Sequence, residues 1–375
     1  MKVLEEFRFR NGAILAGRVV QSPMVTRGST EDGFVGAENF AYYGARSKVA
    51  AAIITEASSV SAQGLAFPNG LSFASDAQVE GLTTLATAMK KDGAKAIAQL
   101  HHGGRESRVT LAREGTTYAP SALDFSFLDH VPTAMTDQQV RQVIQEFGEA
   151  TRRAIEAGFD GVEIHGANHY LLQQFFSAFS NRREDDWGGS FEKRMAFPLA
   201  VVREVKRTMA AANAPADFIL GYRLSPEEIH GENVGYTFRE SLLLAKELAK
   251  FELDYLHLSL RGGSDATPID QTVKRPFTDL FKEAIGTETA LISVSEVFDL
   301  PSAEAALEHS DLVAIARAAL VEPNFLDKIR NGKADDIVRT ISPERLSIVK
   351  WPAGLIEWLT GPNTLPPVPG IESIR

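Results

Sequence analysis

The chain has 375 residues, of which 44% are hydrophobic and 23% are charged, and its formal net charge is −10. This composition supports a large folded core and argues against extensive disorder. The negative charge argues against a nucleic-acid partner, because binding a phosphate backbone requires a basic surface. No apolar run approaches the roughly 18 residues that a membrane span needs. We therefore expect a cytoplasmic protein with no nucleic-acid and no membrane partner.

Two absences narrow the chemistry further. The N-terminal segment MKVLEEFRFRNG has acids where a signal peptide would have an uninterrupted apolar region. The chain contains no cysteine, which excludes disulfides, thiolate catalysis, thiolate zinc sites and cysteine-ligated iron–sulfur clusters. We expect no bound metal.

Short aliphatic runs recur along the whole chain. They occupy residues 17–24, 51–57, 94–100, 161–165, 218–224, 255–260, 290–294 and 312–316. Most of the gaps can hold an amphipathic helix, for example 137–157, 191–212, 236–250 and 302–309. This alternation is typical of parallel βα units, and eight such units close a barrel. The sequence predicts an α/β protein with a single (β/α)8 TIM barrel; a doubly wound open sheet is the structural alternative.

We divide the chain into a barrel over residues 1–335 and a C-terminal arm over residues 336–375. The arm contains Trp351 and Trp358 and several prolines, and we expect it to pack on the barrel or on a neighbouring subunit of a homo-oligomer. Two predicted loops, after Val25 and from Leu100 to Asp137, are longer than a compact domain usually carries. Such loops are commonly functional, and here they would lie at the mouth of the barrel.

The fourth predicted strand is followed by three polar residues in quick succession. These are His165, Asn168 and Tyr170. Barrel enzymes place their chemistry at the carboxyl ends of the strands, so this position indicates a site. The alternative interpretation is that His165 and Asn168 only satisfy the backbone of the following turn.

Polar residues also stand at the ends of other predicted strands. Gln99 ends the third strand and Arg223 the fifth, where a core position would be apolar and a polar group needs a partner. Arg223 could instead pair with a buried carboxylate such as Glu56 or Glu163, and Gln99 could bridge loop carbonyls. Taken together, these strand ends indicate a large, planar, hydrogen-bonding ligand at the mouth.

Six segments of the chain carry a family resemblance. They are SPMVTR (22–27), IITEAS (53–58), QLHHGGR (99–105), HGANHYLLQQF (165–175), SNRREDDWGGSFEKR (180–194) and DLVAIARAALVEP (311–323). With these motifs the chain resembles the old yellow enzyme family of flavin mononucleotide oxidoreductases, in its bacterial NADH:flavin oxidoreductase branch. The resemblance covers roughly residues 7–330 and implies an eight-stranded βα barrel with flavin mononucleotide (FMN) at its mouth.

The resemblance also implies roles for individual residues. Those implied to lie along the flavin or to meet its pyrimidine edge are Pro23, Met24, Val25, Thr26, Ala57, Gln99 and Arg223. Those implied to hold the phosphate are Ser295, Ala316 and Arg317. His165 and Asn168 match the pair that binds a substrate oxygen, and Tyr170 matches the tyrosine that donates a proton.

The implied activity is that of an FMN-dependent NAD(P)H oxidoreductase of the ene-reductase type. NADH or NADPH would reduce the tightly bound FMN and leave, and an electrophilic alkene activated by a carbonyl or nitro group would then take its place, which gives ping-pong kinetics. Two alternatives stay open: free flavin or oxygen as the acceptor, and a flavin-binding barrel with little turnover. A phosphate-ester isomerase or aldolase is disfavoured, because no predicted strand ends in a lysine.

Four positions depart from the pattern that the resemblance implies. Val25 stands where relatives often have threonine or cysteine, and Ala316 replaces a common glycine. Glu296 would repel a phosphate if it pointed inward. His169 replaces another common glycine, and we interpret it as a solvated loop histidine.

Overall fold

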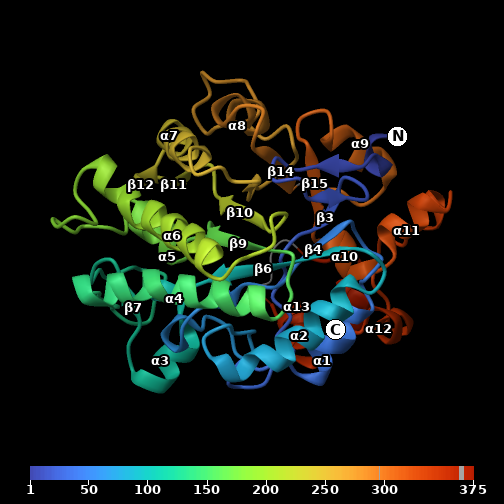
Figure 1. The fold of residues 1–375 in the computed structure, drawn as a ribbon, viewed down its shortest axis with the longest axis horizontal. Coiled ribbons are helices and arrows are strands. Elements are labelled where there is room, and N and C mark those ends of the chain that lie inside the picture. The colour runs from blue at the N-terminus through green and yellow to red at the C-terminus, as the bar shows by residue number, and fades with distance from the viewer. Residues whose placement is uncertain (295, 363–366) are drawn as a thin grey trace.

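Eight parallel strands close into a barrel at the centre of the molecule (Figure 1). The structure is a computed structural model, and it describes residues 1–294, 296–362 and 367–375. The barrel strands are β3 (Val19–Gln21), β4 (Ala52–Ile54), β6 (Lys95–His101), β9 (Gly161–Gly166), β10 (Ile219–Leu224), β13 (Tyr255–Leu258), β14 (Ala290–Val294) and β15 (Leu312–Ile315). Each pairs in parallel with its neighbours in chain order, and β15 returns to β3. The predicted TIM barrel is confirmed, and the open sheet is excluded by this closure.

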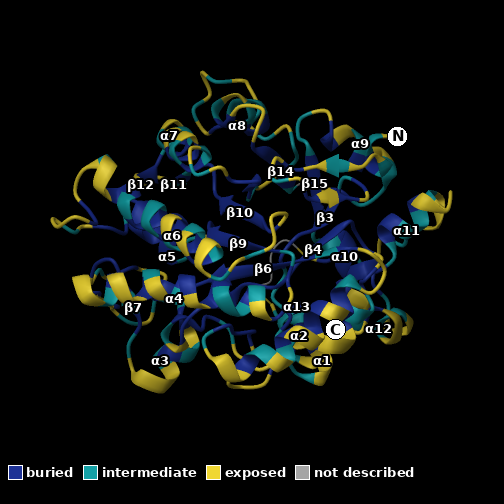
Figure 2. Ribbon diagram, in the orientation of Figure 1, coloured by how far each residue is buried: buried dark blue, intermediate teal, exposed yellow. Residues whose placement is uncertain are grey.

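The barrel strands form the buried centre, and exposed residues gather on the surrounding helices (Figure 2). Every residue of β9 and β10 is buried, as expected for parallel strands that are covered on both faces. Gly221 illustrates how tightly the interior is filled: a Cβ atom there would lie 2.1 Å from the ring of Tyr255. The aliphatic runs predicted the strands because this burial demands apolar residues at nearly every position.

Helices surround the barrel on its outer side. They are α1 (Ala37–Gly44), α2 (Val79–Lys90), α4 (Asp137–Glu156), α6 (Phe191–Ala211), α7 (Phe238–Ala249), α8 (Phe277–Ile285), α9 (Leu300–Ala306), α10 (Arg317–Val321) and α11 (Phe325–Arg330). The start of α4 is fixed by Thr136 and Gln139, which cap each other's backbone. Its end is fixed by Gly158, whose φ of +76° suits a glycine after a helix.

Smaller elements decorate the barrel. They are α3 (Arg108–Glu114), α5 (Leu171–Phe176), β1 (Phe7–Arg8), β2 (Ile14–Leu15), β5 (Ser58–Ser59), β7 (Tyr118–Ala119), β8 (Thr133–Ala134), β11 (Glu228–His230) and β12 (Asn233–Tyr236). The predicted long loop from Leu100 to Asp137 therefore contains a helix and a pair of short strands. The helix predicted to begin at Tyr236 begins at Phe238, because Tyr236 belongs to β12, which pairs with β11.

The C-terminal segment packs against the barrel beside α1 (Figure 1) through α12 (Pro343–Val349) and α13 (Ala353–Thr360). Arg46, two residues after the end of α1, is fully buried and donates hydrogen bonds to the carbonyls of Ala319, Leu320 and Val349. The indole of Trp351 also donates to the carbonyl of Leu320, at 2.9 Å. Within the described ranges, none of the helices is long and apolar enough to cross a membrane.

Candidate active site

The strand register brings the polar residues of the predicted site together. Gln99 of β6 lies opposite Glu163 of β9, and Arg223 of β10 lies opposite both His165 of β9 and His257 of β13. Side chains two residues apart on a strand point to the same face, so Glu163 and His165 share one side of β9. The barrel therefore holds two adjacent layers of polar groups near its carboxyl end.

Glu163 is the centre of the deeper layer and is fully buried. Its carboxylate accepts a hydrogen bond from the amide of Gln99 at 2.6 Å and lies 2.9 Å from Nδ1 of His257. Burial alone would raise the pKa of Glu163, but His257, Arg223 and Gln99 outweigh it and hold the pKa below its ordinary value. Glu163 is thus an anion whose pKa the nearby charge of Arg223 helps to lower, and its contact partners are His257 and Gln99.

His165 lies at the mouth among aromatic rings. Its ring centroid is 5.3 Å from that of His101 and 5.4 Å from that of Tyr170, and the rings of His101 and Tyr170 are 4.4 Å apart. Burial, assisted by His101 and Arg223, lowers the pKa of His165 well below its ordinary value. Burial also raises the pKa of Tyr170, with a smaller contribution from Glu106. The pocket therefore contains neutral imidazoles beside a protonated phenol.

Asn168 stands on the turn that follows β9, and its φ of +59° places it in the left-handed region. Its backbone N–H donates to the hydroxyl of Ser225 at 3.0 Å, and its side-chain Oδ1 accepts a hydrogen bond from Ser259 at 2.8 Å. Ser259 in turn accepts a hydrogen bond from Arg223 at 3.3 Å. Because Oδ1 is occupied, the Nδ2 donor of Asn168 is the end left for a ligand.

His169 also has a left-handed backbone, with φ +66°. Its side chain is 30% exposed, Nδ1 lies 3.7 Å from the carboxylate of Glu228, and its ring is 5.1 Å from that of His230. Its backbone is held from both sides, since its N–H donates to Gln173 and its carbonyl accepts from Gln174. His169 is therefore an anchored residue at the edge of the site rather than a freely solvated one.

A cavity of about 790 Å³ opens beside these residues. Strand ends and loops of the barrel supply most of its lining, including Ser22, Pro23, Met24, Arg223, Ser259, Arg261, Glu296, Phe298, Ala316 and Arg317. The C-terminal segment supplies Trp358, Leu359, Pro367 and Val368. The volume is in the range of small-molecule and cofactor sites. Five of the ten residues predicted to hold the flavin thus line one cavity.

The cavity suits a flat ligand that carries an anionic group. Nε of Arg223 and Oγ of Ser22 are both buried and have no hydrogen-bond partner. Because buried polar groups are normally hydrogen-bonded, these two atoms indicate that a ligand binds here. Arg317 stacks on Phe298 with its guanidinium 5.1 Å from the ring centroid. Glu296 does point toward this cation, at 3.2 Å from the guanidinium. These residues fit FMN, with Glu296 as a competitor for its phosphate.

The other predicted cofactor residues that the structure describes are not among those that line this cavity. Val25 is partly buried, Ala57 and Gln99 are buried, and Gln99 is engaged with Glu163. The side chain of Thr26 is directed to the buried carboxylate of Glu56, which accepts from both its hydroxyl and its backbone N–H. The hydroxyl of Thr26 therefore does not take the place of the threonine or cysteine side chain that relatives often have at the position of Val25. Ser295 lies outside the described residues.

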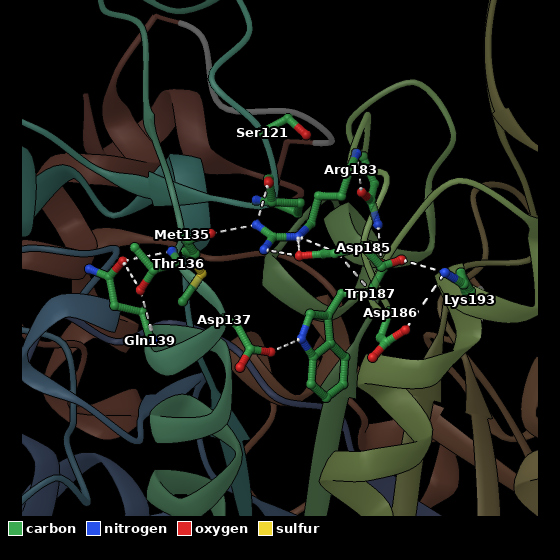
Figure 3. Close-up of polar contacts among 12 residues, drawn as sticks. Ser121, Met135, Thr136, Asp137, Gln139, Arg183, Asp185, Asp186, Trp187 and Lys193 are labelled. Carbon is green, nitrogen blue, oxygen red and sulfur yellow. Dashed lines mark hydrogen bonds and ion pairs between the residues drawn. The ribbon is translucent and has the colours of Figure 1, made fainter.

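The segment from Ser180 to Arg194 anchors the loops around the site (Figure 3). Arg183 donates to the carbonyls of Pro120 and Met135 and pairs with Asp185. The indole of Trp187 donates to Asp137 at the start of α4, at 2.7 Å. This motif therefore ties the loop after β9 to the loop after β6, a structural role that its sequence alone did not reveal.

Our sequence reasoning missed several residues of the site. His101 is 1% exposed, neither of its ring nitrogens has a hydrogen-bond partner, and burial with His102 lowers its pKa to about 3. The sequence could have indicated His101. It follows Gln99 by two residues on the same face of β6, just as His165 follows Glu163 on β9. The cavity residues of the C-terminal segment had no such signal, since no periodicity relates them to the barrel.

Comparison with known proteins identifies the family of the chain. The sequence profile of the NADH:flavin oxidoreductase / NADH oxidase family matches residues 4–336. The chain is 42% identical over 347 residues to a probable NADH-dependent flavin oxidoreductase, YqiG, of Bacillus subtilis (strain 168), and covers 90% of each protein. It is 41% identical over 342 residues to an NADH:acrylate oxidoreductase of Vibrio harveyi, which accounts for 88% of this chain but 33% of that longer protein.

The fold has matching solved structures. Morphinone reductase in complex with tetrahydroNAD superposes with a TM-score of 0.75 at 28% identity, covering 89% of this chain and 92% of that one. That complex holds a nicotinamide cofactor analogue, in agreement with a dinucleotide reductant, and the matched profile implies FMN. The chain belongs to the NADH:flavin oxidoreductase / NADH oxidase family and is an NAD(P)H-dependent flavin oxidoreductase of the old yellow enzyme type.

Proposed function

We propose that the chain uses NADH or NADPH to reduce alkenes that are activated by a carbonyl or nitro group, in a ping-pong cycle at a single pocket. The observation that carries this proposal is the constellation of Tyr170, His165 and Asn168 at the mouth of the barrel. A protonated phenol lies 5.4 Å, ring to ring, from a neutral imidazole, and the amide of Asn168 is oriented by Ser259. An acid beside two donors is what reduction of a conjugated alkene requires.

The residues that would hold FMN are Pro23, Met24, Arg223, Ala316 and Arg317 in the lining, and we propose that Val25, Thr26, Ala57 and Gln99 complete the site. Ser295, which the resemblance assigns to the phosphate, stays a prediction. When bound, FMN supplies the two-electron carrier that accepts a hydride from the nicotinamide and delivers it to the β-carbon of the alkene. Arg223 places a permanent positive charge in this cavity, where it would stabilise an anionic ring. We propose that the arm, residues 336–375, closes the cavity through Trp358 and Leu359.

His165 and Asn168 bind and orient the acceptor. Their N–H groups would donate to the carbonyl or nitro oxygen, on which negative charge develops during the reaction. Preorganised donors of this kind contribute roughly 3–4 kcal/mol each to stabilising such a charge. The neutral state of His165 matters here, because it keeps an N–H donor without adding a charge that would have to be buried.

Tyr170 would donate the proton to the α-carbon from its phenol oxygen. Its raised pKa keeps it protonated across the working pH range, so it can act as a general acid. The rings of His101 and Phe67 pack against it, with centroids 4.4 Å and 6.1 Å away. They fix the ring and limit access of water to the pocket.

Anaerobic half-reactions test this function directly. The purified protein should be yellow, should bleach with NADH or NADPH, and should regain its colour with an enone such as 2-cyclohexenone or with a nitroalkene. Acrylate belongs in the same panel, because it appears in the name of a longer relative. Reoxidation by oxygen or free flavin alone, with no alkene reduced, would favour the alternative acceptors. Cytoplasmic location stays a prediction.

A further inference from the structure

Three side chains of the deeper polar layer form a continuous chain of contacts: Gln99, Glu163 and His257. All three are at most 1% exposed. The amide of Gln99 donates to Oε1 of Glu163 at 2.6 Å, and Oε2 of the same carboxylate lies 2.9 Å from Nδ1 of His257. The strands β9 and β13 are separated by β10, so the second contact spans the interior of the barrel. No step proposed above involves Glu163 or His257.

The charge of Glu163 fixes how its two neighbours are oriented. Glu163 is ionised, and an ionised carboxylate can only accept hydrogen bonds. Gln99 must therefore present an N–H of its amide to Glu163, and His257 must carry a proton on Nδ1. Within the described residues, Oε1 of Gln99 accepts no hydrogen bond, so this oxygen is the acceptor left for a ligand.

The charge of Glu163 also acts on Arg223. Burial lowers the pKa of Arg223, and Glu163 is the main influence in the opposite direction. His257 adds no charge, because burial and Arg223 lower its pKa against the effect of Glu163. Arg223 lines the cofactor cavity, whereas Glu163 is not among the lining residues. A ligand in the cavity therefore meets a cation in the wall and is also close to a buried anion outside it.

We propose that Glu163 is a positioning residue for FMN and acts on it through Gln99 and Arg223. By accepting the amide N–H of Gln99, it turns the carbonyl oxygen toward the cofactor, and the oxidised flavin ring offers a single N–H, at N3. Its negative charge also opposes that of Arg223. Uptake of a hydride from the nicotinamide leaves one negative charge on the ring, so an anion close to Arg223 makes the reduced ring less stable and the bound flavin a stronger reductant. This inference rests on the proposed placement of FMN against Gln99 and Arg223, and it does not depend on the acceptor.

The reduction potential of the bound flavin tests the effect of the charge. Glu163→Gln keeps the length of the side chain and removes its charge, so the ratio of reduced to oxidised flavin at a fixed potential should rise about 10- to 100-fold. For a two-electron couple this change is a shift of about 30–60 mV to more positive values. Glu163→Asp keeps the charge and should stay close to the unaltered holoenzyme. Titration against a reference dye measures both variants without any alkene.

The affinities of the apoprotein for FMN and for 3-methyl-FMN test the orientation of Gln99. Methylation removes the N–H at N3, so the unaltered protein should prefer FMN by at least about 2- to 10-fold, the range for one hydrogen bond. Glu163→Asp is one methylene shorter and should not reach the amide of Gln99. The amide can then rotate, and the preference for FMN should fall by about 2-fold or more.

Glu322→Gln is the matched control. Glu322 is also a buried carboxylate, it accepts a hydrogen bond from Lys328 at 2.7 Å, and it is not among the residues that line the cavity. Its replacement should change neither the potential nor the preference for FMN.

An unchanged potential in Glu163→Gln would overturn the proposal, and so would an unchanged preference in Glu163→Asp. If removal of the charge prevents Glu163→Gln from folding, the preference of Glu163→Asp alone decides. Failure of the unaltered protein to take up FMN would overturn the proposed cofactor site instead. Failure to reduce any alkene would overturn only the proposed function, because neither measurement includes an acceptor.

Discussion

The hydroxyl of Ser259 donates to Oδ1 of Asn168 at 2.8 Å, and this contact determines which end of the amide faces the substrate pocket. Arg223 donates to the same hydroxyl at 3.3 Å. A residue of the cofactor cavity is thereby linked through one serine to the residue that would bind the substrate oxygen. This linkage makes Ser259 a positioning residue of the site.

Ser259→Ala should weaken acceptor binding while sparing the reaction with NADH. Loss of this hydrogen bond lets the amide of Asn168 rotate, and a bond of this kind contributes about 0.5–1.5 kcal/mol, or roughly 2- to 10-fold in Kd. Titration of the oxidised enzyme with a phenol, followed by flavin absorbance, measures the change. Ser264→Ala, in the same loop, is the control. An unchanged Kd in the Ser259 variant would show that Asn168 is oriented by other contacts.

Arg223→Ala should lose flavin or slow its reduction. Removal of the cation takes a positive charge away from the buried anion of Glu163 and removes the charge that would stabilise the reduced ring. By analogy with the loss of one preorganised donor, the rate should fall by roughly 10²- to 10³-fold. Arg223→Lys should recover part of it. The ratio of flavin to protein and the rate of bleaching by NADH report both effects, and normal values for Arg223→Ala would leave Arg223 a purely structural role.

Glu296→Gln should bind FMN more tightly. Glu296 pairs with Arg317 at 3.2 Å, but its side chain is 66% exposed, so the competing interaction is worth only about 0–1 kcal/mol. The dissociation constant of FMN from the apoprotein should fall by at most about 5-fold, and less at high salt. Glu283→Gln removes another exposed ion pair, with Arg275, and should have no effect. Weaker binding in the Glu296 variant would mean that the carboxylate helps to place Arg317 for the phosphate.

Glu56 makes stability depend on pH. Burial raises its pKa to about 7, although hydrogen bonds from Thr26 act in the opposite direction. The folded state therefore holds the proton more tightly than the unfolded state, so this carboxyl group lowers stability as pH rises from about 4.5 to about 7. The difference in free energy of unfolding between the unaltered apoprotein and Glu56→Gln should change by about 3 kcal/mol across that window. A constant difference would show that Glu56 is ionised throughout.

The sequence predicted the barrel well because its eight strands are buried on both faces and so contain little besides apolar residues. It also indicated His165, Asn168, Tyr170 and Arg223 as polar residues at strand ends, and Arg317 through the family resemblance. In the structure these residues lie at or just after the carboxyl ends of β9, β10 and β15. The connections between them were less predictable. Glu163 was foreseen only as a possible ion-pair partner of Arg223, whereas its contacts are with Gln99 and His257, because the strand register that joins them is a property of the closed sheet.

The contributions of distant segments could be predicted only coarsely: we expected the arm on the barrel or on a neighbouring subunit and the loop from Leu100 to Asp137 at the mouth, but not which of their residues would line a cavity. Trp358 and Pro367 reach the cofactor cavity from the C-terminal arm, and Phe127 lines another cavity from the loop after β6. These placements depend on tertiary packing, such as the hydrogen bonds from Arg46 to the carbonyls of Ala319, Leu320 and Val349 and the hydrogen bond from Trp187 to Asp137. No local pattern encodes such contacts.

The central claim, that one pocket serves both half-reactions with Tyr170 as the proton donor, is tested most directly by stopped-flow measurement of Tyr170→Phe. Reduction of the flavin by NADH needs no proton from this residue, so its rate should be nearly unchanged. Oxidation by an enone needs a proton at the α-carbon and should slow by roughly 10²- to 10⁴-fold, while oxidation by oxygen should persist. Equal slowing of both half-reactions, or no slowing of either, would contradict the account.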